Sequence, residues 1–162
     1  MELLITANGN KYTIQDKGKG RTIYTVKKKG FGAGKYVLLD TSNYNLYSLV
    51  KTGEDRKPTF IITHNGTMLI QLSCKSMFLD PTINVKGKNL SKESVEYVIT
   101  SKDRREFDII NNETSVGHIT TLRTMNNELQ YEMEIENKIF DDYIPLFAVA
   151  VDLIFGELNK SV

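Results

Sequence analysis

The segment near the end of the chain constrains its fold most. The run Tyr143–Phe155 (YIPLFAVAVDLIF) is apolar apart from Asp152, so a helix formed from it has no polar face. A helix that is hydrophobic all round must be buried, either in protein or in lipid. The run has 13 residues, fewer than the roughly 20 that a helix needs to cross a bilayer. The length therefore favours a helix buried in the protein core over a membrane span.

Residues at both ends of this run define the expected helix. Asp141 or Asp142 can cap the first turn, where a carboxylate also meets the positive end of the helix dipole. Pro145 is tolerated because it falls in that first turn. Gly156 is a common type of helix terminator. We therefore expect a helix over about residues 141–156.

Almost everything before this helix has the pattern of short β-strands. Three similar units begin at Tyr12, Tyr36 and Phe60, spaced 24 residues apart, and each is followed by a second β-rich segment. Asn65-Gly66 is a strong signal for a two-residue hairpin turn. Four more strands follow, and residues 3–6 and a weaker segment near 82–86 complete the set. We expect about twelve strands within residues 2–136, near 3–6, 12–16, 23–26, 36–40, 46–50, 60–64, 68–72, 82–86, 95–100, 106–110, 116–122 and 129–136.

The last of these strands alternates strictly between apolar and polar residues, as an antiparallel strand with one wet face does. Its apolar set is Leu129, Tyr131, Met133 and Ile135. Its polar set includes Glu132, Glu134 and Glu136, which we interpret as a solvated face and not as a cation site.

One helix and many strands together indicate a barrel. A helix with its side chains is about 10 to 12 Å across, and an eight-stranded barrel is already filled by its own side chains. Wider barrels can enclose a central helix. We therefore predict a mainly β protein, in which residues 1–162 form a single domain: an antiparallel barrel of about twelve strands around one hydrophobic C-terminal α-helix.

The same residues carry a resemblance to a known family. The repeated Tyr-x-Ile-x-Asp and Tyr-x-Val units, the glycine-rich link at 30–34, and the closing segments 142–146 and 148–152 resemble the tubby C-terminal-like superfamily, most closely the LURP-one-related proteins and their small bacterial members. The resemblance implies a twelve-stranded barrel around a hydrophobic helix. It also implies kinship with tubby proteins, which bind phosphoinositides, and with phospholipid scramblases.

Two departures from those families limit what the resemblance implies. The chain has neither the cysteine-rich nor the proline-rich region of scramblases, and their acidic calcium-binding segment has no counterpart that we can place. The lipid-contacting basic residues of tubby proteins do not match this sequence position by position. No functional residue is therefore transferred from either family.

Charge is distributed unevenly along the chain, although the net charge is only +1. Residues 1–81 carry 12 Lys or Arg against 6 Asp or Glu, and residues 82–162 carry 9 against 14. One segment within 17–35 is purely basic, and two interpretations of it stay open: a patch for phosphate-bearing partners, or a solvated hairpin whose lysines prevent edge pairing. Its candidate anion-binding residues are Lys17, Lys19, Arg21, Lys27, Lys28, Lys29 and Lys35.

No catalytic motif accompanies this basic segment. The glycine-rich link at 30–34 lacks the Gly-Lys-Ser/Thr ending of a phosphate-binding loop, and we interpret it as a flexible connection. His64, His118 and Cys74 have no metal-ligand spacing, and Cys74 has no evident catalytic partner, so we expect no catalytic residue, metal or cofactor. Asp152 is expensive inside an apolar helix unless it is paired, and its role is either structural or functional.

These observations favour a non-enzymatic binding or scaffold domain that contacts an anionic membrane or a protein partner through its surface. The alternatives are a nucleic-acid-binding protein using the segment 17–35, and, less favoured, a small-molecule carrier or enzyme using the barrel interior. The single cysteine and the short apolar run at the N-terminus favour a cytoplasmic protein, with possible peripheral association at the membrane. The oligomeric state is not encoded in any pattern of the sequence.

Overall fold

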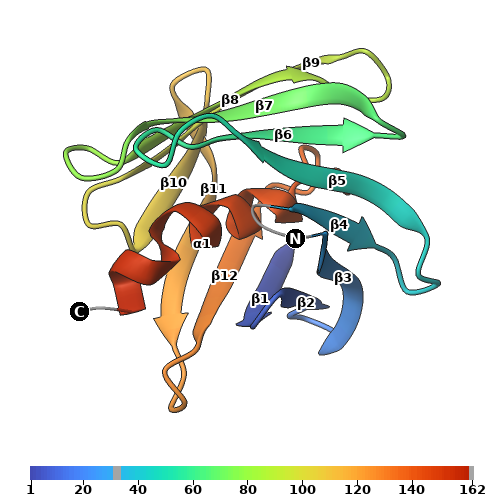
Figure 1. The fold of residues 1–162 in the computed structure, drawn as a ribbon, viewed down its shortest axis with the longest axis horizontal. Coiled ribbons are helices and arrows are strands. Elements are labelled where there is room, and N and C mark those ends of the chain that lie inside the picture. The colour runs from blue at the N-terminus through green and yellow to red at the C-terminus, as the bar shows by residue number, and fades with distance from the viewer. Residues whose placement is uncertain (31–33, 161–162) are drawn as a thin grey trace.

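The structure, a computed structural model, describes residues 1–30 and 34–160, which form twelve β-strands followed by one α-helix (Figure 1). The strands are β1 (Glu2–Asn8), β2 (Lys11–Asp16), β3 (Arg21–Lys29), β4 (Lys35–Leu39), β5 (Asn45–Thr52), β6 (Thr59–His64), β7 (Thr67–Ser76), β8 (Thr82–Lys88), β9 (Ser94–Ser101), β10 (Glu106–Asn111), β11 (Thr114–Arg123) and β12 (Leu129–Ile135). The helix is α1 (Pro145–Lys160).

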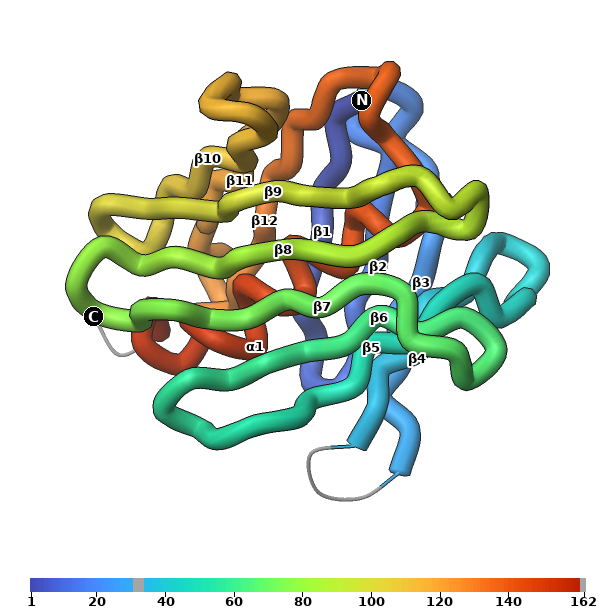
Figure 2. The backbone as a smooth tube through the Cα atoms, turned by 90° about the horizontal axis from the view of Figure 1, so that it is seen from above, coloured from blue at the N-terminus to red at the C-terminus, as the bar shows by residue number. Residues whose placement is uncertain are grey.

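The strands form a closed antiparallel barrel in which each strand pairs with its neighbours in the sequence. The barrel closes where β1 pairs with β12, with Leu3 opposite Met133 and Ile5 opposite Tyr131. Figure 2 shows β5 to β9 crossing in front of α1, with β10 to β12 and β1 to β4 completing the wall behind it. The expected twelve-stranded barrel is confirmed.

Local sequence accounts for the hairpins that build this barrel. Asn65 and Gly66 have φ angles of 50° and 80°, the left-handed pair that a two-residue hairpin turn of type I′ needs. In β12 the four residues predicted to face inward, Leu129 to Ile135 at every second position, are all buried. Alternation therefore sets which face of each strand points into the barrel.

The helix lies inside the barrel and supplies much of its core. Ile144 and every residue from Leu146 to Val151 are fully buried. Rings from three strands pack against rings of the helical segment, at centroid distances of 5.3 to 6.1 Å. These pairs are Tyr47 with Tyr143, Tyr97 with Phe147, and Phe107 with Phe155. Such edge and tilted ring pairs contribute about 0.5–1.5 kcal/mol each beyond their buried area.

The bounds of the helix differ from those expected from the sequence. It begins at Pro145 and has no acidic residue in its first turn. Neither expected cap contacts the helix in this way: Oδ1 of Asp141 accepts from the Asp142 amide, and the Asp142 carboxylate accepts from the Tyr24 hydroxyl on β3. Gly156 lies inside the helix and does not end it. A Cβ at this position would stand 2.7 Å from Oδ1 of Asp152, one turn earlier on the same helix, so the glycine leaves room for the carboxylate that Tyr131 holds.

Candidate anion-binding surface

The seven basic residues expected to bind anions lie on β3, β4 and the β2–β3 turn. Lys17 and Lys19 are in the turn and Arg21 begins β3, whereas Lys29 ends β3 and Lys35 begins β4. Eight residue steps separate Arg21 from Lys29, which is about 26 Å along a strand. The structure therefore places Lys17, Lys19 and Arg21 at one end of the barrel and Lys27, Lys28, Lys29 and Lys35 toward the other.

The group around the β2–β3 turn has carboxylates close by. Lys17 Nζ lies 3.1 Å from Oε1 of Glu132 on β12. Lys19 and Arg21 line a surface hollow of about 600 Å³ that Asp16, Asp40 and Asp142 also line. This end of the basic segment is therefore a surface of mixed charge.

The lysines near the β3–β4 connection face one another instead. Lys29 is directly opposite Lys35, and Lys27 is directly opposite Lys11, a residue that the sequence pattern did not single out. Within residues 1–30 and 34–160, none of these four lysines has an ion-pair partner. Like charges directly opposite on neighbouring strands are destabilising. An anion that bound between them would relieve this repulsion.

Lys11, Lys29 and Lys35 lie at the end of the barrel where α1 finishes, and Lys27 adjoins that end on β3, opposite Lys11. We call this end the basic end. It comprises the turns after β1, β3, β5, β7, β9 and β11, the two strand residues on each side of every turn, and the last turn of α1. Its thirteen described Lys or Arg residues are Lys11, Lys28, Lys29, Lys35, Lys51, Arg56, Lys57, Lys75, Lys102, Arg104, Arg105, Arg123 and Lys160. Its seven Asp or Glu residues are Glu54, Asp55, Asp80, Asp103, Glu106, Glu128 and Glu157.

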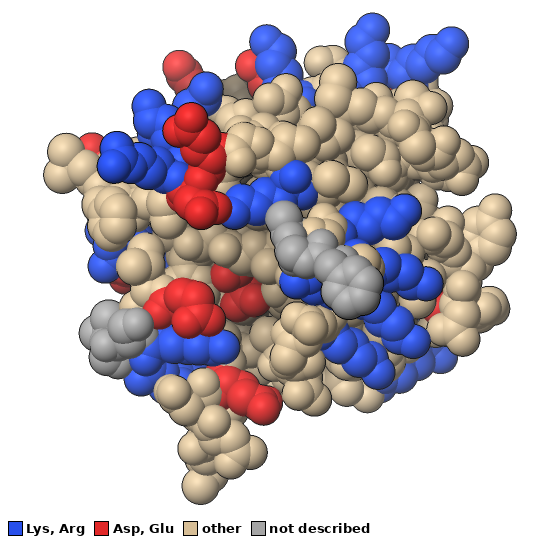
Figure 3. Space-filling model, in the orientation of Figure 1, with Lys and Arg blue, Asp and Glu red and all other residues tan. Residues whose placement is uncertain are grey.

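The opposite end of the barrel has the reverse balance. This end comprises the turns after β2, β4, β6, β8 and β10, the segment between β12 and α1, the two strand residues on each side of these, and the start of β1. Its six basic residues are Lys17, Lys19, Arg21, Lys88, Lys92 and Lys138. Its nine acidic residues are Glu2, Asp16, Asp40, Glu93, Glu113, Glu134, Glu136, Asp141 and Asp142. On the face drawn in Figure 3, blue Lys and Arg side chains cover more of the surface than red Asp and Glu side chains do. The molecule is therefore polarised between its two ends.

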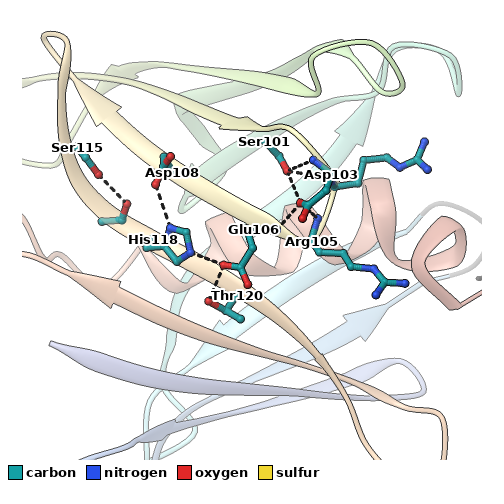
Figure 4. Close-up of polar contacts among 10 residues, drawn as sticks. Ser101, Asp103, Arg105, Glu106, Asp108, Ser115, His118 and Thr120 are labelled. Atoms are coloured by element: carbon teal, nitrogen blue, oxygen red, sulfur yellow. Dashed lines mark hydrogen bonds and ion pairs between the residues drawn. The ribbon is translucent and has the colours of Figure 1, made fainter.

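Sequence reasoning missed a second cluster, on the outer face of β10 and β11 (Figure 4). His118 is hydrogen-bonded through Nδ1 to Oδ1 of Asp108 at 3.0 Å and through Nε2 to Oε2 of Glu106 at 2.5 Å. Thr120 donates to the same Glu106 oxygen at 3.1 Å. Partial burial by itself would lower the pKa of His118, but the two carboxylates outweigh it and raise that pKa above its ordinary value.

This cluster is an ion-pair network more than a reactive site. Both ring nitrogens of His118 are already engaged, so neither is available to activate a nucleophile. Among the described residues, no group of three His, Cys, Asp or Glu side chains could hold a metal ion. Cys74 is buried, and burial raises the pKa of its thiol, which disfavours the reactive thiolate.

The remaining sequence expectations concern the glycine-rich link and Asp152. Residues 31–33 of the link lie outside the described residues. Asp152 is paired, as its position in an apolar helix requires, but its partners are tyrosine hydroxyls: Tyr12 donates to Oδ2 and Tyr131 to Oδ1.

No helix within residues 1–30 and 34–160 has the length and apolarity that crossing a membrane requires.

A closed twelve-stranded barrel filled by its own C-terminal helix, with one basic and one acidic end, defines the class of this protein as a filled β-barrel. The chain belongs to the LURP-one-related family, whose model matches residues 2–154. A search of curated proteins found no match. The X-ray structure of a protein from Arabidopsis thaliana, AT5G01750, has the same fold, with a TM-score of 0.63 and 17% identity over 98% of this chain and 90% of that chain.

Proposed function

We propose that this protein is a non-enzymatic, cytoplasmic binding domain that associates peripherally with anionic phospholipid membranes through its basic end. The observation that supports this most is that two cross-strand lysine pairs, Lys27 with Lys11 and Lys29 with Lys35, have no ion-pair partner among the described residues. Lipid phosphates offer the negative charge that these lysines lack within the described chain. Each Lys or Arg held near an anionic membrane surface contributes about 1 kcal/mol of attraction.

The filled interior directs this function to the surface. A carrier or enzyme using the inside of the barrel needs room for a ligand, whereas α1 fills the axis with side chains that are fully buried. The proposal uses Lys27, Lys28, Lys29 and Lys35 of the candidate residues. Lys17, Lys19 and Arg21 lie at the opposite end, beside carboxylates, and stay outside it.

Vesicle flotation tests the proposal. The full chain should float with vesicles of phosphatidylcholine and phosphatidylserine at low salt and less at moderate salt, and it should not float with pure phosphatidylcholine. The triple variant Lys27→Glu, Lys29→Glu, Lys35→Glu should lose this flotation. A matched variant at the opposite end, Lys88→Glu, Lys92→Glu, Lys138→Glu, changes the same charge and should keep it.

Two results would contradict the proposal. One is the absence of flotation of the unaltered protein with anionic vesicles at either salt concentration. The other is equal loss of flotation in both triple variants, which would mean that net charge matters and the basic end does not. If the protein instead bound short single-stranded or duplex nucleic acid with a steep salt dependence, and ignored vesicles, the nucleic-acid alternative would replace the membrane one.

A further inference from the structure

Large apolar side chains stand at the tips of two turns at the basic end. Phe78 and Leu79, in the turn between β7 and β8, are 69% and 83% exposed. Met125, in the turn between β11 and β12, is fully exposed. Scattered apolar residues are normal on protein surfaces. Two adjacent ones at the tip of one turn, within a basic surface, require a more specific explanation.

A basic side chain adjoins the Phe78–Leu79 tip. The Arg104 guanidinium carbon lies 5.5 Å from the centre of the Phe78 ring. The β7–β8 and β9–β10 turns are joined where the Ser101 amide donates to the Pro81 carbonyl at 3.0 Å. Figures 1 and 2 both show these two turns side by side, on the same side of the molecule as the C-terminus. The tip is therefore an apolar point with a cation from the neighbouring turn beside it.

Hydrogen bonds within the two turns hold this arrangement. The Ser76 hydroxyl donates to the Leu79 carbonyl, and the Thr82 hydroxyl donates to the Asp80 carbonyl at 2.7 Å. In the neighbouring turn, Oδ1 of Asp103 accepts from the amides of Arg105 and Glu106, both at 2.9 Å. Phe78 and Leu79 are thus presented outward by a structured turn, and little further ordering is needed for them to meet a partner.

Charge distinguishes this surface from the other exposed apolar residues. Tyr44, Met68 and Leu90 are also exposed, but they lie in or beside turns of the opposite end, where acidic residues outnumber basic ones. An anionic bilayer repels that end and attracts the basic one. The combination of cations with apolar tips matches the membrane interface, where phosphates lie outside and acyl chains begin a few ångströms deeper.

We propose that Phe78 and Leu79 insert into the anionic membrane when the basic end docks, so that the β7–β8 turn is the apolar anchor and sets the orientation of the barrel. This inference rests on the proposed function, to which it adds the anchor. Lysines then provide the salt-sensitive attraction, and the apolar tip provides a part of the binding that salt does not screen. Met125 provides a second, smaller contact from the β11–β12 turn.

The absence of tryptophan from the sequence makes a direct test simple. Leu79→Trp and Leu90→Trp each introduce a single tryptophan, which can be excited selectively over the tyrosines, one at the basic end and one at the opposite end, at exposed positions. With phosphatidylcholine–phosphatidylserine vesicles that carry brominated acyl chains, the emission of Leu79→Trp should shift to the blue and be quenched. The emission of Leu90→Trp should stay unshifted and unquenched.

A second variant measures what the anchor contributes. Phe78→Ser together with Leu79→Ser should weaken vesicle binding about tenfold or more at moderate salt, because the transfer of two large side chains from water is lost. Its thermal unfolding should match that of the unaltered protein, since both residues are exposed. The matched control is Met68→Ser together with Leu90→Ser at the opposite end, which should bind as the unaltered protein does.

The outcomes separate the anchor from the function that it serves. If the unaltered protein binds anionic vesicles but Leu79→Trp is not quenched and the double serine variant binds equally well, the anchor is wrong and the proposed function stands. If the unaltered protein binds no anionic vesicles, both are wrong. Equal quenching of Leu79→Trp and Leu90→Trp would also overturn the anchor, because it would mean that the barrel has no preferred orientation.

Discussion

The Tyr131 hydroxyl on β12 donates a hydrogen bond of 2.6 Å to Oδ1 of Asp152 on α1, and so ties the helix to the barrel wall. Tyr12 on β2 donates to Oδ2 of the same carboxylate at 2.5 Å. Burial first, and the nearby Asp152 charge second, raise the pKa of both tyrosines. Both hydroxyls therefore stay protonated at neutral pH and act as donors to the one carboxylate in the apolar part of the helix.

Removal of either tyrosine hydroxyl should destabilise the protein. Tyr12→Phe and Tyr131→Phe each leave one oxygen of Asp152 without its tyrosine partner, which should lower the free energy of unfolding by about 1–3 kcal/mol. Urea unfolding measures this change. Tyr44→Phe is the control, because Tyr44 is 66% exposed and its loss of a hydroxyl should change nothing measurable. Wild-type stability in both single variants would mean that water satisfies Asp152 instead.

Replacement of Gly156 in α1 by alanine should lower the stability of the protein, although this change usually stabilises a helix. Alanine normally favours a helix over glycine by about 1 kcal/mol. At Gly156, however, the new Cβ would stand 2.7 Å from Oδ1 of Asp152 and 3.7 Å from Cδ1 of Leu129. We expect Gly156→Ala to destabilise the protein by about 1–3 kcal/mol, because the methyl group can be accommodated only by displacing a carboxylate that the Tyr12 and Tyr131 hydroxyls hold in place.

Gly18→Ala is the control for this helix substitution. At Gly18 the nearest atom to a new Cβ is Oδ1 of Asp16 at 3.5 Å, an ordinary contact. Urea unfolding of both variants should show a loss only for Gly156→Ala. A gain in stability for Gly156→Ala would mean that the Asp152 side chain moves away from the methyl group at little cost.

The core around the helix axis should be sensitive to a cavity. Phe147 is fully buried, and its ring packs 5.8 Å from that of Tyr97 and 5.9 Å from that of Tyr143. Phe147→Ala should lower the free energy of unfolding by about 3–5 kcal/mol, which thermal or urea unfolding measures. Phe78→Ala removes the same side chain from an exposed turn and should cost little. Equal effects of the two variants would contradict a barrel filled by its helix.

The sequence predicted the barrel because its main determinants are local. Alternation along 129–136 and the Asn65-Gly66 turn each identify a strand or hairpin from a few neighbouring residues. The apolar helix then required a wide enclosure. Tyr12 and Tyr131 are 140 and 21 residues from Asp152, so no local pattern indicated that tyrosines would be its partners.

The charged surfaces were less predictable for a related reason. Whether Lys17 and Lys29 share a patch depends on the length of β3. Because β3 runs from Arg21 to Lys29, Lys17 and Lys29 lie at opposite ends of the β2–β3 hairpin. The His118 cluster depends on the register between β10 and β11, which shifts at Ile109/Ile110. Because a shift of one residue reverses the faces of a strand, such pairs cannot be read from the sequence alone.

Protonation of His118 should stabilise the fold at mildly acid pH. On the outer face, His118 is opposite Asp108 on β10 and Glu134 on β12, and Glu106 completes a strongly acidic environment. Its pKa in the folded protein lies above the ordinary value of 6.5. A raised folded pKa gives stability that is fully present below the unfolded pKa and is lost as pH rises through the folded pKa. The contribution should therefore be complete below about pH 6.5 and fade above it.

His118→Gln tests this pH dependence, because it keeps a polar side chain of similar length but cannot become charged. Its free energy of unfolding should fall below that of the unaltered protein by up to about 1 kcal/mol at about pH 5, since His118 is partly exposed and water screens the pairs. At about pH 9 the two proteins should differ little. Glu113→Gln, in the β10–β11 turn, removes a charge that has no contact with His118 and should give a difference that does not follow this titration. A His118→Gln difference that is equal at both pH values would show that packing, and not charge, holds the imidazole between Glu106 and Asp108.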